Sequence, residues 1–302
     1  MNSIKAFDIS KKYNQITALE HISFQVDEGE IFGFIGPDGA GKTTLFRILT
    51  TLVLPDAGHG SVCGYDIVKD YKKIRQIVGY MPGKFSLYQD LSVEENLAFF
   101  ASVFGVSVHN NYHLISDIYS HIEPFKERRA GKLSGGMKQK LALCCALIHK
   151  PKVLFLDEPT TGIDAVSRKE FWNLLKGLKN EHITILVSTP YMDEASLCDN
   201  VALIQDGKIM KTAPPNAIIS GFDKKLFAIR AQSAYHLISE LEKHPACHAV
   251  YPFGQELHFV TMNENLNTDA IKKYLEEKKH TDVEIKLADI TIEDCFMDLM
   301  NK

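Results

Sequence analysis

Short apolar runs alternate with amphipathic stretches along the first two thirds of the chain. The segments 30–35, 153–156 and 183–187 are compact apolar runs rich in branched side chains. Such runs suit strands that are buried on both faces, as in a parallel sheet. Between them, apolar residues recur three and four positions apart, which indicates helices. The pattern therefore predicts an α/β domain, in which strands alternate with helices.

Two of the expected helices begin with a capping-box pattern, a Ser followed three residues later by a Glu. Ser92 with Glu95 precedes apolar residues at 97, 100, 101 and 104, and Ser167 with Glu170 precedes those at 171, 174, 175 and 178. In a capping box, each of the two side chains accepts a hydrogen bond from a backbone N–H at the start of the helix. We therefore expect helices to begin at Ser92 and at Ser167.

The pattern changes after the Pro214-Pro215 pair. Before it, Asp206-Gly207 lies between two short strand-like runs and predicts a hairpin. After it, strand-like and helix-like segments follow the order β-α-β-β-α-β, which is the ferredoxin-like arrangement; they span 225–231, 235–243, 248–253, 256–262, 269–279 and 283–287. We expect a large domain over residues 1–220 and a small α+β domain over residues 221–302.

Composition excludes several classes of protein. The 302 residues carry a net charge of −4, so no basic field predicts nucleic-acid binding. No apolar run approaches the roughly 20 residues of a membrane-spanning helix. The polar start of the chain, residues 1–11, also lacks the apolar core of a signal peptide, so we expect a cytoplasmic protein. The six cysteines form no C-x-x-C pair and are expected to be reduced thiols.

A glycine-rich segment supplies the first candidate chemistry. Residues 36–43 fit the pattern G-x-x-x-x-G-K-[ST] in full, with a strand expected before them and a helix after them. Backbone N–H groups in such a loop point at phosphate, the Lys neutralises the β- and γ-phosphates, and the Thr hydroxyl binds Mg²⁺. The candidate nucleotide-binding residues are Gly36, Pro37, Asp38, Gly39, Ala40, Gly41, Lys42, Thr43 and the following Thr44.

The apolar run 153–156 ends in Asp157-Glu158. A carboxylate at the end of a buried strand can hold Mg²⁺, and we assign this role to Asp157, beside Thr43. Glu158 can polarise the attacking water and is the candidate catalytic residue. An apolar strand ending in two acids is also common as a purely structural feature. The pairing with the phosphate loop is what favours the chemical interpretation.

The segment 133–137, with the sequence LSGGM, lies one expected helix before the Asp157 strand. Here the chain resembles the ATP-binding subunits of ABC transporters, whose signature is LSGGQ, and residues 4–212 follow that family in order. The resemblance implies a P-loop NTPase fold with a RecA-like core, an antiparallel β subdomain near the N-terminus and a helical subdomain at about 90–148. It also implies a head-to-tail dimer, in which ATP lies between one phosphate loop and the Ser134, Gly135 and Gly136 of a second nucleotide-binding subunit.

Two further positions carry a role only through the resemblance. Tyr13 lies where the family places the aromatic ring that stacks on adenine, although it can equally be an ordinary exposed strand Tyr. Asp164 matches the D-loop, which communicates across the dimer in this family.

A narrower resemblance is to the ATP-binding subunits of ABC-2-type exporters, including bacterial drug-efflux ATPases. It is carried by segments 162–168 and 191–195, and by 292–296, which is similar to the LEDVF tail of those subunits. This resemblance implies an ABC-2-type permease as membrane partner, ATP and Mg²⁺ as cofactors, and a peripheral location on the inner face of the cell membrane. The tail segment can be a regulatory element or a simple packing helix.

Two residues depart from the family pattern. Gly83 follows Tyr80-Met81-Pro82, where the family has the Gln of the Q-loop, and Pro190 follows Ser188-Thr189, where it has the switch His. Neither residue has a side chain that can donate a hydrogen bond. We therefore expect a weakly active site in an asymmetric pair with a different ATPase subunit, with a homodimer of this chain as the open alternative. The alternatives are an ABC ATPase without a transport role and a non-hydrolytic ATP-binding regulatory subunit.

Overall fold

The computed structural model describes residues 2–231, 234–280 and 282–300, and the chain divides into two compact units, Met1–Pro214 and Pro215–Lys302. The division falls earlier than the expected boundary after residue 220. The reason is tertiary packing, because helix α8 (Pro215–Ser220) packs against the last helix, α11 (Ile292–Met300). The thiol of Cys295 also donates to the carbonyl oxygen of Ile218 at 3.6 Å.

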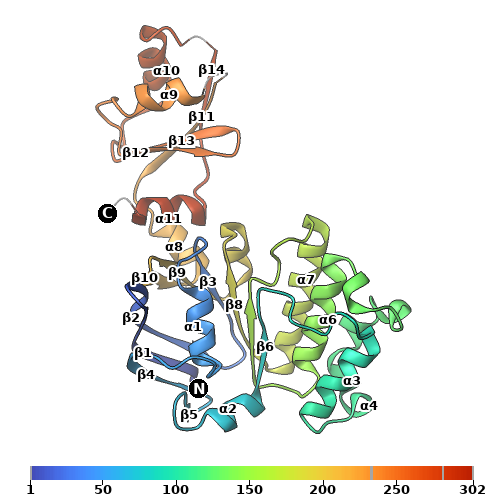
Figure 1. The fold of residues 1–302 in the computed structure, drawn as a ribbon. Helices are drawn as coiled ribbons and strands as arrows, with labels where there is room; N and C mark the ends of the chain where they lie inside the picture. The colour runs from blue at the N-terminus through green and yellow to red at the C-terminus, as the bar shows by residue number, and fades with distance from the viewer. Residues whose placement is uncertain (1, 232–233, 281, 301–302) are drawn as a thin grey trace. The chain divides into compact units, whose positions relative to one another are not determined.

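The first unit contains a six-stranded sheet with the strand order β10-β9-β3-β8-β7-β6 (Figure 1). The strands are β3 (Ile31–Ile35), β6 (Val78–Met81), β7 (Val153–Asp157), β8 (Thr184–Thr189), β9 (Asn200–Gln205) and β10 (Lys208–Ala213). All neighbours are parallel except the β9–β10 hairpin. Strands β3, β7 and β8 are buried along their whole length, which explains why the sequence shows them as unbroken apolar runs.

A second, antiparallel sheet stands beside it, with the order β2-β1-β4-β5. Its strands are β1 (Asn2–Tyr13), β2 (Ile16–Asp27), β4 (Ala57–Val62) and β5 (Tyr65–Asp66). Helix α1 (Lys42–Leu49) lies between the two sheets (Figure 1), and one hydrophobic core joins side chains of both sheets and the helix. Within that core the ring of Phe46 packs edge-on against Phe34 and Phe155. This packing fixes the helix at the end of β3, where the phosphate loop begins.

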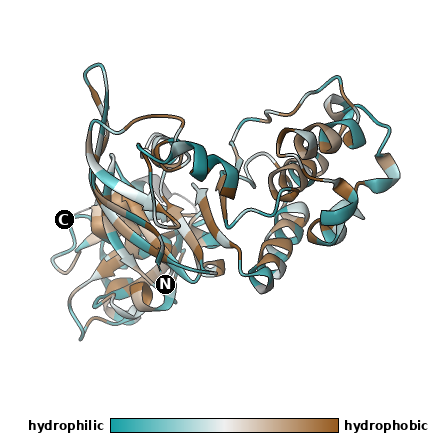
Figure 2. Cartoon of the chain, turned by 90° about the horizontal axis from the view of Figure 1, so that it is seen from below, coloured by the Kyte–Doolittle hydropathy of each residue, from teal (hydrophilic) through white to brown (hydrophobic). Residues whose placement is uncertain are grey.

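Helices form the remaining layer of the first unit. They are α2 (Tyr71–Ile77), α3 (Val93–Val103), α4 (Val108–Asn111), α5 (Ser116–Tyr119), α6 (Gly135–Leu147) and α7 (Ala165–Leu178), with 3₁₀ turns at Tyr112–Leu114, Glu123–Phe125, Ala130–Lys132, Lys179–Glu181 and Met192–Leu197. Helices α3 to α6 gather away from the antiparallel sheet as the expected helical subdomain (Figure 1). In Figure 2 these helices carry both hydrophobic and hydrophilic residues.

One of the two predicted capping boxes is confirmed and the other is wrong. Ser92 and Glu95 form both hydrogen bonds of the box at the start of α3. Helix α7 begins earlier than predicted, because Asp164 is its N-cap and accepts from the N–H groups of Val166 and Ser167. Ser167 therefore lies inside the first turn and does not cap the helix.

The second unit has the predicted ferredoxin-like fold. Its elements are β11 (Lys225–Ala231), α9 (Ala234–Leu241), β12 (Ala249–Phe253), β13 (Glu256–Thr261), α10 (Thr268–Glu277) and β14 (Val283–Leu287), and the antiparallel sheet has the order β12-β13-β11-β14. Helices α9 and α10 pack with the sheet in one hydrophobic core. Among the helices that the structure describes in either unit, none is both long and apolar enough to span a bilayer.

Candidate functional site

The predicted phosphate loop connects β3 to α1 and adopts a conformation that requires glycine. Gly41 is the N-cap of α1 and has a φ of 101°, a left-handed conformation that side chains rarely adopt. A Cβ atom at Gly41 would also meet the carbonyl oxygen of Ala18, and one at Gly36 would meet that of Ile204. The loop is thus packed between neighbouring strands, and the N-terminus of α1 provides N–H groups for an anion.

Lys42 is almost completely buried, with 3% of its surface exposed. Its Nζ donates hydrogen bonds to the carbonyl oxygens of Gly36 at 2.7 Å and Pro37 at 2.9 Å, and lies 3.5 Å from Oε1 of Glu158. A buried ammonium group needs partners that balance its positive charge. The two carbonyl oxygens are neutral, and the Glu158 carboxylate lies beyond hydrogen-bond distance, so the charge of Lys42 is only partly balanced. A phosphate group could supply the missing charge at this position.

Thr43 and Asp157 meet as the sequence predicts. The Thr43 hydroxyl donates to Oδ1 of Asp157 at 3.1 Å, and the Ser188 hydroxyl donates to the same oxygen at 2.6 Å. Asp157 is buried, with 2% of its surface exposed. A hydroxyl and a carboxylate at this spacing are oxygen ligands of the kind that Mg²⁺ prefers. Lys42, Thr43, Asp157 and Glu158 therefore lie together, and the residues present fit a magnesium-bound phosphate chain.

Two residues of this site were missed by sequence reasoning. Ser188 lies at the end of β8, and its carbonyl oxygen accepts from the Glu158 N–H at 3.0 Å. Tyr80 lies near the end of β6, where burial and the negative charge of Asp157 raise its pKa to about 12. Their position after apolar runs was the available signal, since strand ends of a parallel sheet meet at one edge.

The two departures from the family pattern border the same site. A Cβ atom at Gly83 would lie 3.1 Å from the carbonyl oxygen of Asp157, so the loop after β6 closely approaches that strand. Pro190 directly follows Thr189, whose carbonyl oxygen accepts from the N–H of Gly36 at 3.3 Å. Both positions thus border the phosphate loop or Asp157, but neither offers a hydrogen-bonding side chain.

The signature residues start helix α6. The Ser134 hydroxyl caps the helix by accepting from the Met137 N–H at 3.3 Å, and Gly135 and Gly136 form its first turn. A Cβ atom at Gly136 would lie 2.9 Å from Oγ of Ser167. The start of α6 therefore packs closely against the start of α7.

Asp164 lies at that same junction. Its carboxylate accepts from the Ser167 hydroxyl at 2.7 Å and from the N–H groups of Val166 and Ser167, and these hydrogen bonds lower its pKa. The structure therefore brings Asp164 to the signature residues. In the described part of the chain, no hydrogen bond or ion pair connects residues 134–136 to residues 36–43.

Tyr13 ends strand β1 with 42% of its surface exposed, and the ammonium group of Lys11 lies 5.7 Å from its ring centroid. An exposed ring of this kind can stack on a base, but an exposed strand Tyr has the same appearance. Its predicted contact with adenine therefore stays a prediction.

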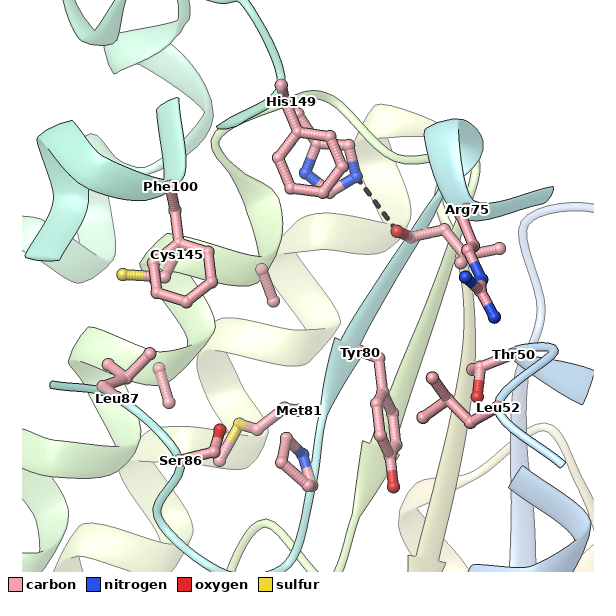
Figure 3. Close-up of a pocket in the computed structure, with 15 residues that line it drawn as sticks. Thr50, Leu52, Arg75, Tyr80, Met81, Ser86, Leu87, Phe100, Cys145 and His149 are labelled. Atoms are coloured by element: carbon pink, nitrogen blue, oxygen red, sulfur yellow. Dashed lines mark hydrogen bonds between the residues drawn. The ribbon is translucent and has the colours of Figure 1, made fainter. Parts of the chain in front are cut away.

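A cavity of about 260 Å³ lies beside the site, between β6 and helices α3 and α6. Figure 3 shows Tyr80 and Met81 of β6 on one side and Phe100 and Cys145 of the helices on the other. His149 lies at one end, where its ring stacks on Phe104 and its Nε2 bonds to the carbonyl oxygen of Val78 at 3.0 Å. The lining is largely apolar, so the cavity suits an apolar side chain.

A family model, known sequences and solved structures all match this chain to the same family of proteins. The family model described as "ABC transporter" matches residues 19–161. The chain is 40% identical over 215 residues to the probable multidrug ABC transporter ATP-binding protein YbhF of Escherichia coli strain K12, a match that covers 70% of this chain and 37% of that protein. It thus spans little more than a third of YbhF. It is 39% identical to the Nod factor export ATP-binding protein I of Burkholderia orbicola strain AU 1054, over 70% of this chain and 71% of that protein.

Solved structures of ABC transporter ATP-binding subunits are also similar to this chain. A structure of an ATP-binding subunit of an ABC transporter matches with a TM-score of 0.66 and 27% identity, over 72% of this chain and 92% of that one. The dimeric structure of MJ0796, a bacterial ABC transporter cassette, matches with a TM-score of 0.63 and 24% identity over 70% of this chain and 98% of that one, which supports the fold alone.

Proposed function

Because this chain belongs to the ABC transporter family of ATP-binding proteins, we propose that it binds Mg²⁺·ATP and energises an ABC-2-type membrane exporter. The observation that carries the proposal is the meeting of Lys42, Thr43 and Asp157 at the end of the parallel sheet. In this proposal Lys42 and the N–H groups of the loop hold the phosphates, and Thr43 with Asp157 holds the metal ion. Magnesium would draw charge from the phosphate oxygens when bound.

Glu158 is the proposed catalytic residue. Its backbone is held in a left-handed conformation, with a φ of 50°, and its N–H donates to the Ser188 carbonyl oxygen. These constraints fix the carboxylate beside Lys42, where it can accept a proton from, or orient, the attacking water. The candidate nucleotide contacts of Tyr13 and of Ser134, Gly135, Gly136 and Asp164 belong to this proposal as well, the last four across a dimer interface.

We further propose that this subunit works in an asymmetric pair. Gly83 and Pro190 remove two groups that position water and charge, and the loss of one such donor commonly costs about 10²–10³ in rate. Its signature residues are complete in Ser134, Gly135 and Gly136. The chain would then hydrolyse ATP slowly at its own loop and complete the site of a different ATPase subunit.

The membrane partner would dock at the cavity beside β6. Leu52, which lines it, is 54% exposed, and Tyr88 at 51% and Val103 at 60% are the chain neighbours of the lining residues Leu87 and Phe104. Exposed apolar groups gathered around a cavity are typical of a protein interface. We propose that a cytoplasmic helix of an ABC-2-type permease inserts an apolar residue here, which would place the chain on the inner face of the membrane. The relatives named for multidrug and Nod factor export support export as the direction.

The proposal is tested by measuring ATP turnover of the purified chain, with Glu158→Gln as the inactive control. We expect ATP to bind and to be hydrolysed slowly, with a large increase when a second ATPase subunit with a Q-loop Gln and a switch His is added. Brisk, cooperative hydrolysis by this chain alone would contradict the asymmetric pair.

A second candidate function is a non-hydrolytic ATP-binding regulatory subunit, and the side-chain losses at Gly83 and Pro190 favour it. A third is an ABC ATPase without a transport role. Purification from membranes in mild detergent separates these candidates. A transport subunit should copurify with a polytopic membrane protein, and it should restore turnover to the pair only while its signature residues are intact.

A further inference from the structure

A buried polar cluster beside the phosphate site has no role in the function proposed so far. It consists of Thr160, Arg168 and Glu194. Thr160 lies two residues after Glu158 and has no exposed surface, and Glu194 lies in the 3₁₀ turn after Pro190 with 1% exposed. Arg168 lies in the first turns of α7, and its N–H donates to the carbonyl oxygen of Asp164 at 2.9 Å. The cluster therefore joins three segments that each border the proposed site.

Its hydrogen bonds are incomplete. The Thr160 hydroxyl donates to Oε1 of Glu194 at 2.7 Å, whereas Nε of Arg168 lies 3.7 Å from that same oxygen, beyond hydrogen-bond distance. Both Nε of Arg168 and Oε2 of Glu194 are buried without a hydrogen-bond partner among the residues that the structure describes. The Arg168 side chain as a whole is 25% exposed, but leaving these two buried atoms without hydrogen-bond partners is costly. A relative movement under about 1 Å would bring Nε of Arg168 within hydrogen-bond distance of Oε1 of Glu194.

Arg168 also holds the loop that contains Pro190. Its guanidinium carbon lies 4.0 Å from the centre of the Tyr191 ring, and Nη1 lies 3.6 Å from a carboxylate oxygen of Asp193. A guanidinium group stacked on an aromatic ring restrains both partners. Arg168 thus connects α7 to the loop in which Pro190 replaces a hydrogen-bonding side chain.

The same end of α7 also reaches the signature residues. Ser167 packs against Gly136, and Asp164 holds the first turn of the helix. A continuous set of contacts therefore runs from the turn after Glu158 through Thr160, Glu194 and Arg168 to the start of α6. None of these contacts involves the side chain of Gly83 or Pro190, the two positions that lack polar side chains.

We propose that Glu194 is a positioning residue that couples occupancy of the phosphate site to the start of α7 and the signature, with Thr160 and Arg168 as its two contacts. When Glu158 rearranges around a bound γ-phosphate, the turn at Thr160 moves with it and draws Glu194 into a full hydrogen bond with Arg168. The start of α7 then shifts against Gly136. This inference rests on the proposed ATP binding, and it assigns the coupling to residues of this chain alone.

The chain has a natural probe for this movement. Its single tryptophan, Trp172, lies on α7 one turn after Arg168, with 2% of its surface exposed and its indole N–H without a partner in the described structure. A buried indole in such a position reports small changes in its surroundings through its fluorescence.

The experiment titrates the full chain with Mg²⁺·ATP and follows Trp172 fluorescence, while radiolabelled ATP measures binding in parallel. For the native chain we expect a saturable fluorescence change at the concentrations at which ATP binds. Glu194→Gln keeps the shape and the acceptor for Thr160 but removes the negative charge that attracts Arg168, and it should bind ATP with unchanged affinity but lose the fluorescence change. Thr160→Val should lose it too, whereas the matched control Thr160→Ser should retain it.

The inference is overturned if Glu194→Gln and Thr160→Val keep the fluorescence response, or if the native chain binds ATP without one. Absence of ATP binding to the native chain would instead refute the proposed function. Melting temperatures identify a variant that fails to fold. If Glu194→Gln does so, the two Thr160 variants decide the question, because Thr160→Val exchanges only the hydroxyl for a methyl group and Thr160→Ser keeps the hydroxyl.

Discussion

Both units of the chain bury charged side chains, but the two units differ in how completely those side chains are hydrogen-bonded. In the second unit, Asp294 of α11 has no exposed surface, and both of its carboxylate oxygens are fully used. Oδ1 accepts from the Tyr251 hydroxyl at 2.9 Å and pairs with Nδ1 of His258 at 2.6 Å, and Oδ2 accepts from the N–H and hydroxyl of Thr291 at 2.8 and 2.7 Å. This network holds the last helix against its sheet.

In the first unit, two buried charged side chains beside the phosphate loop, Lys42 and Glu194, keep unused bonding capacity. Lys42 lies 3.5 Å from Glu158, and Glu194 lies 3.7 Å from Arg168. Burial of a charged side chain therefore does not by itself mark a functional site. Unmet bonding capacity at the edge of a parallel sheet does, because a ligand can then supply the missing partner.

Asp294→Ala should have the largest effect and should act on stability. It leaves a buried His258 and two hydroxyls without their acceptor, and breaking a buried pair in this way costs about 3–5 kcal/mol in the free energy of unfolding. Chemical denaturation of the full chain measures the loss. The control Asp289→Ala, at an exposed position, should change little. If Asp294→Ala and Asp289→Ala lowered the free energy of unfolding equally, the buried network around Asp294 would have no special role in stability.

Gly83→Gln combined with Pro190→His should have the next largest effect and should act on rate. Restoring two polar side chains beside Asp157 and the phosphate loop should raise ATP turnover by about 10²–10³, since one positioned donor commonly supplies that much. Gly83 has no left-handed φ, so a side chain is tolerated there after a small shift from the Asp157 carbonyl oxygen. The same pair of changes in a Glu158→Gln background should stay inactive. If the double variant with native Glu158 showed no gain in turnover, the absence of these two side chains would not be what limits the rate.

Lys42→Ala should weaken ATP binding while costing less stability than Asp294→Ala. A hydrogen bond to a charged group contributes about 1.5–3 kcal/mol, which corresponds to roughly a tenfold to hundredfold rise in Kd. Equilibrium binding of radiolabelled ATP measures it, and Lys176→Ala, on the exposed side of α7, is the matched control. Unchanged affinity in Lys42→Ala would refute the assigned phosphate site.

The smallest effect should be a dependence of stability on acid. Burial acts to raise the pKa of Asp294, but hydrogen bonds from His258, Thr291 and Tyr251 outweigh it and hold the pKa below the ordinary value of 3.8. A carboxyl group with a lowered pKa in the folded state stabilises the fold fully above its unfolded-state pKa and loses that contribution as pH falls through the folded-state pKa. Unfolding free energies measured from pH values above 3.8 to values below it should therefore fall, and Asp294→Asn should lessen the slope.

Several features of the chain were set by sequence alone because they are local. The phosphate loop follows from glycines at fixed spacing between a strand and a helix, and Gly41 indeed takes a left-handed conformation. Strands β3, β7 and β8 are apolar throughout, and the β-α-β-β-α-β order of the second unit follows from its own periodicity. In each case the deciding residues are neighbours along the chain.

Only the tertiary structure decided which distant residues meet. Ser188 reaches Asp157 because β8 pairs with β7, and Thr160 reaches Glu194 because the turns after those strands share one sheet edge. The start of α7 was predicted at Ser167, but Asp164 caps it, since the turn before the helix packs against the signature glycines. Asp164 and Ser167 are both residue types that cap helices, and polar residues follow several strands. The choice among them depends on strand order and packing, which bring together residues that a local pattern cannot connect.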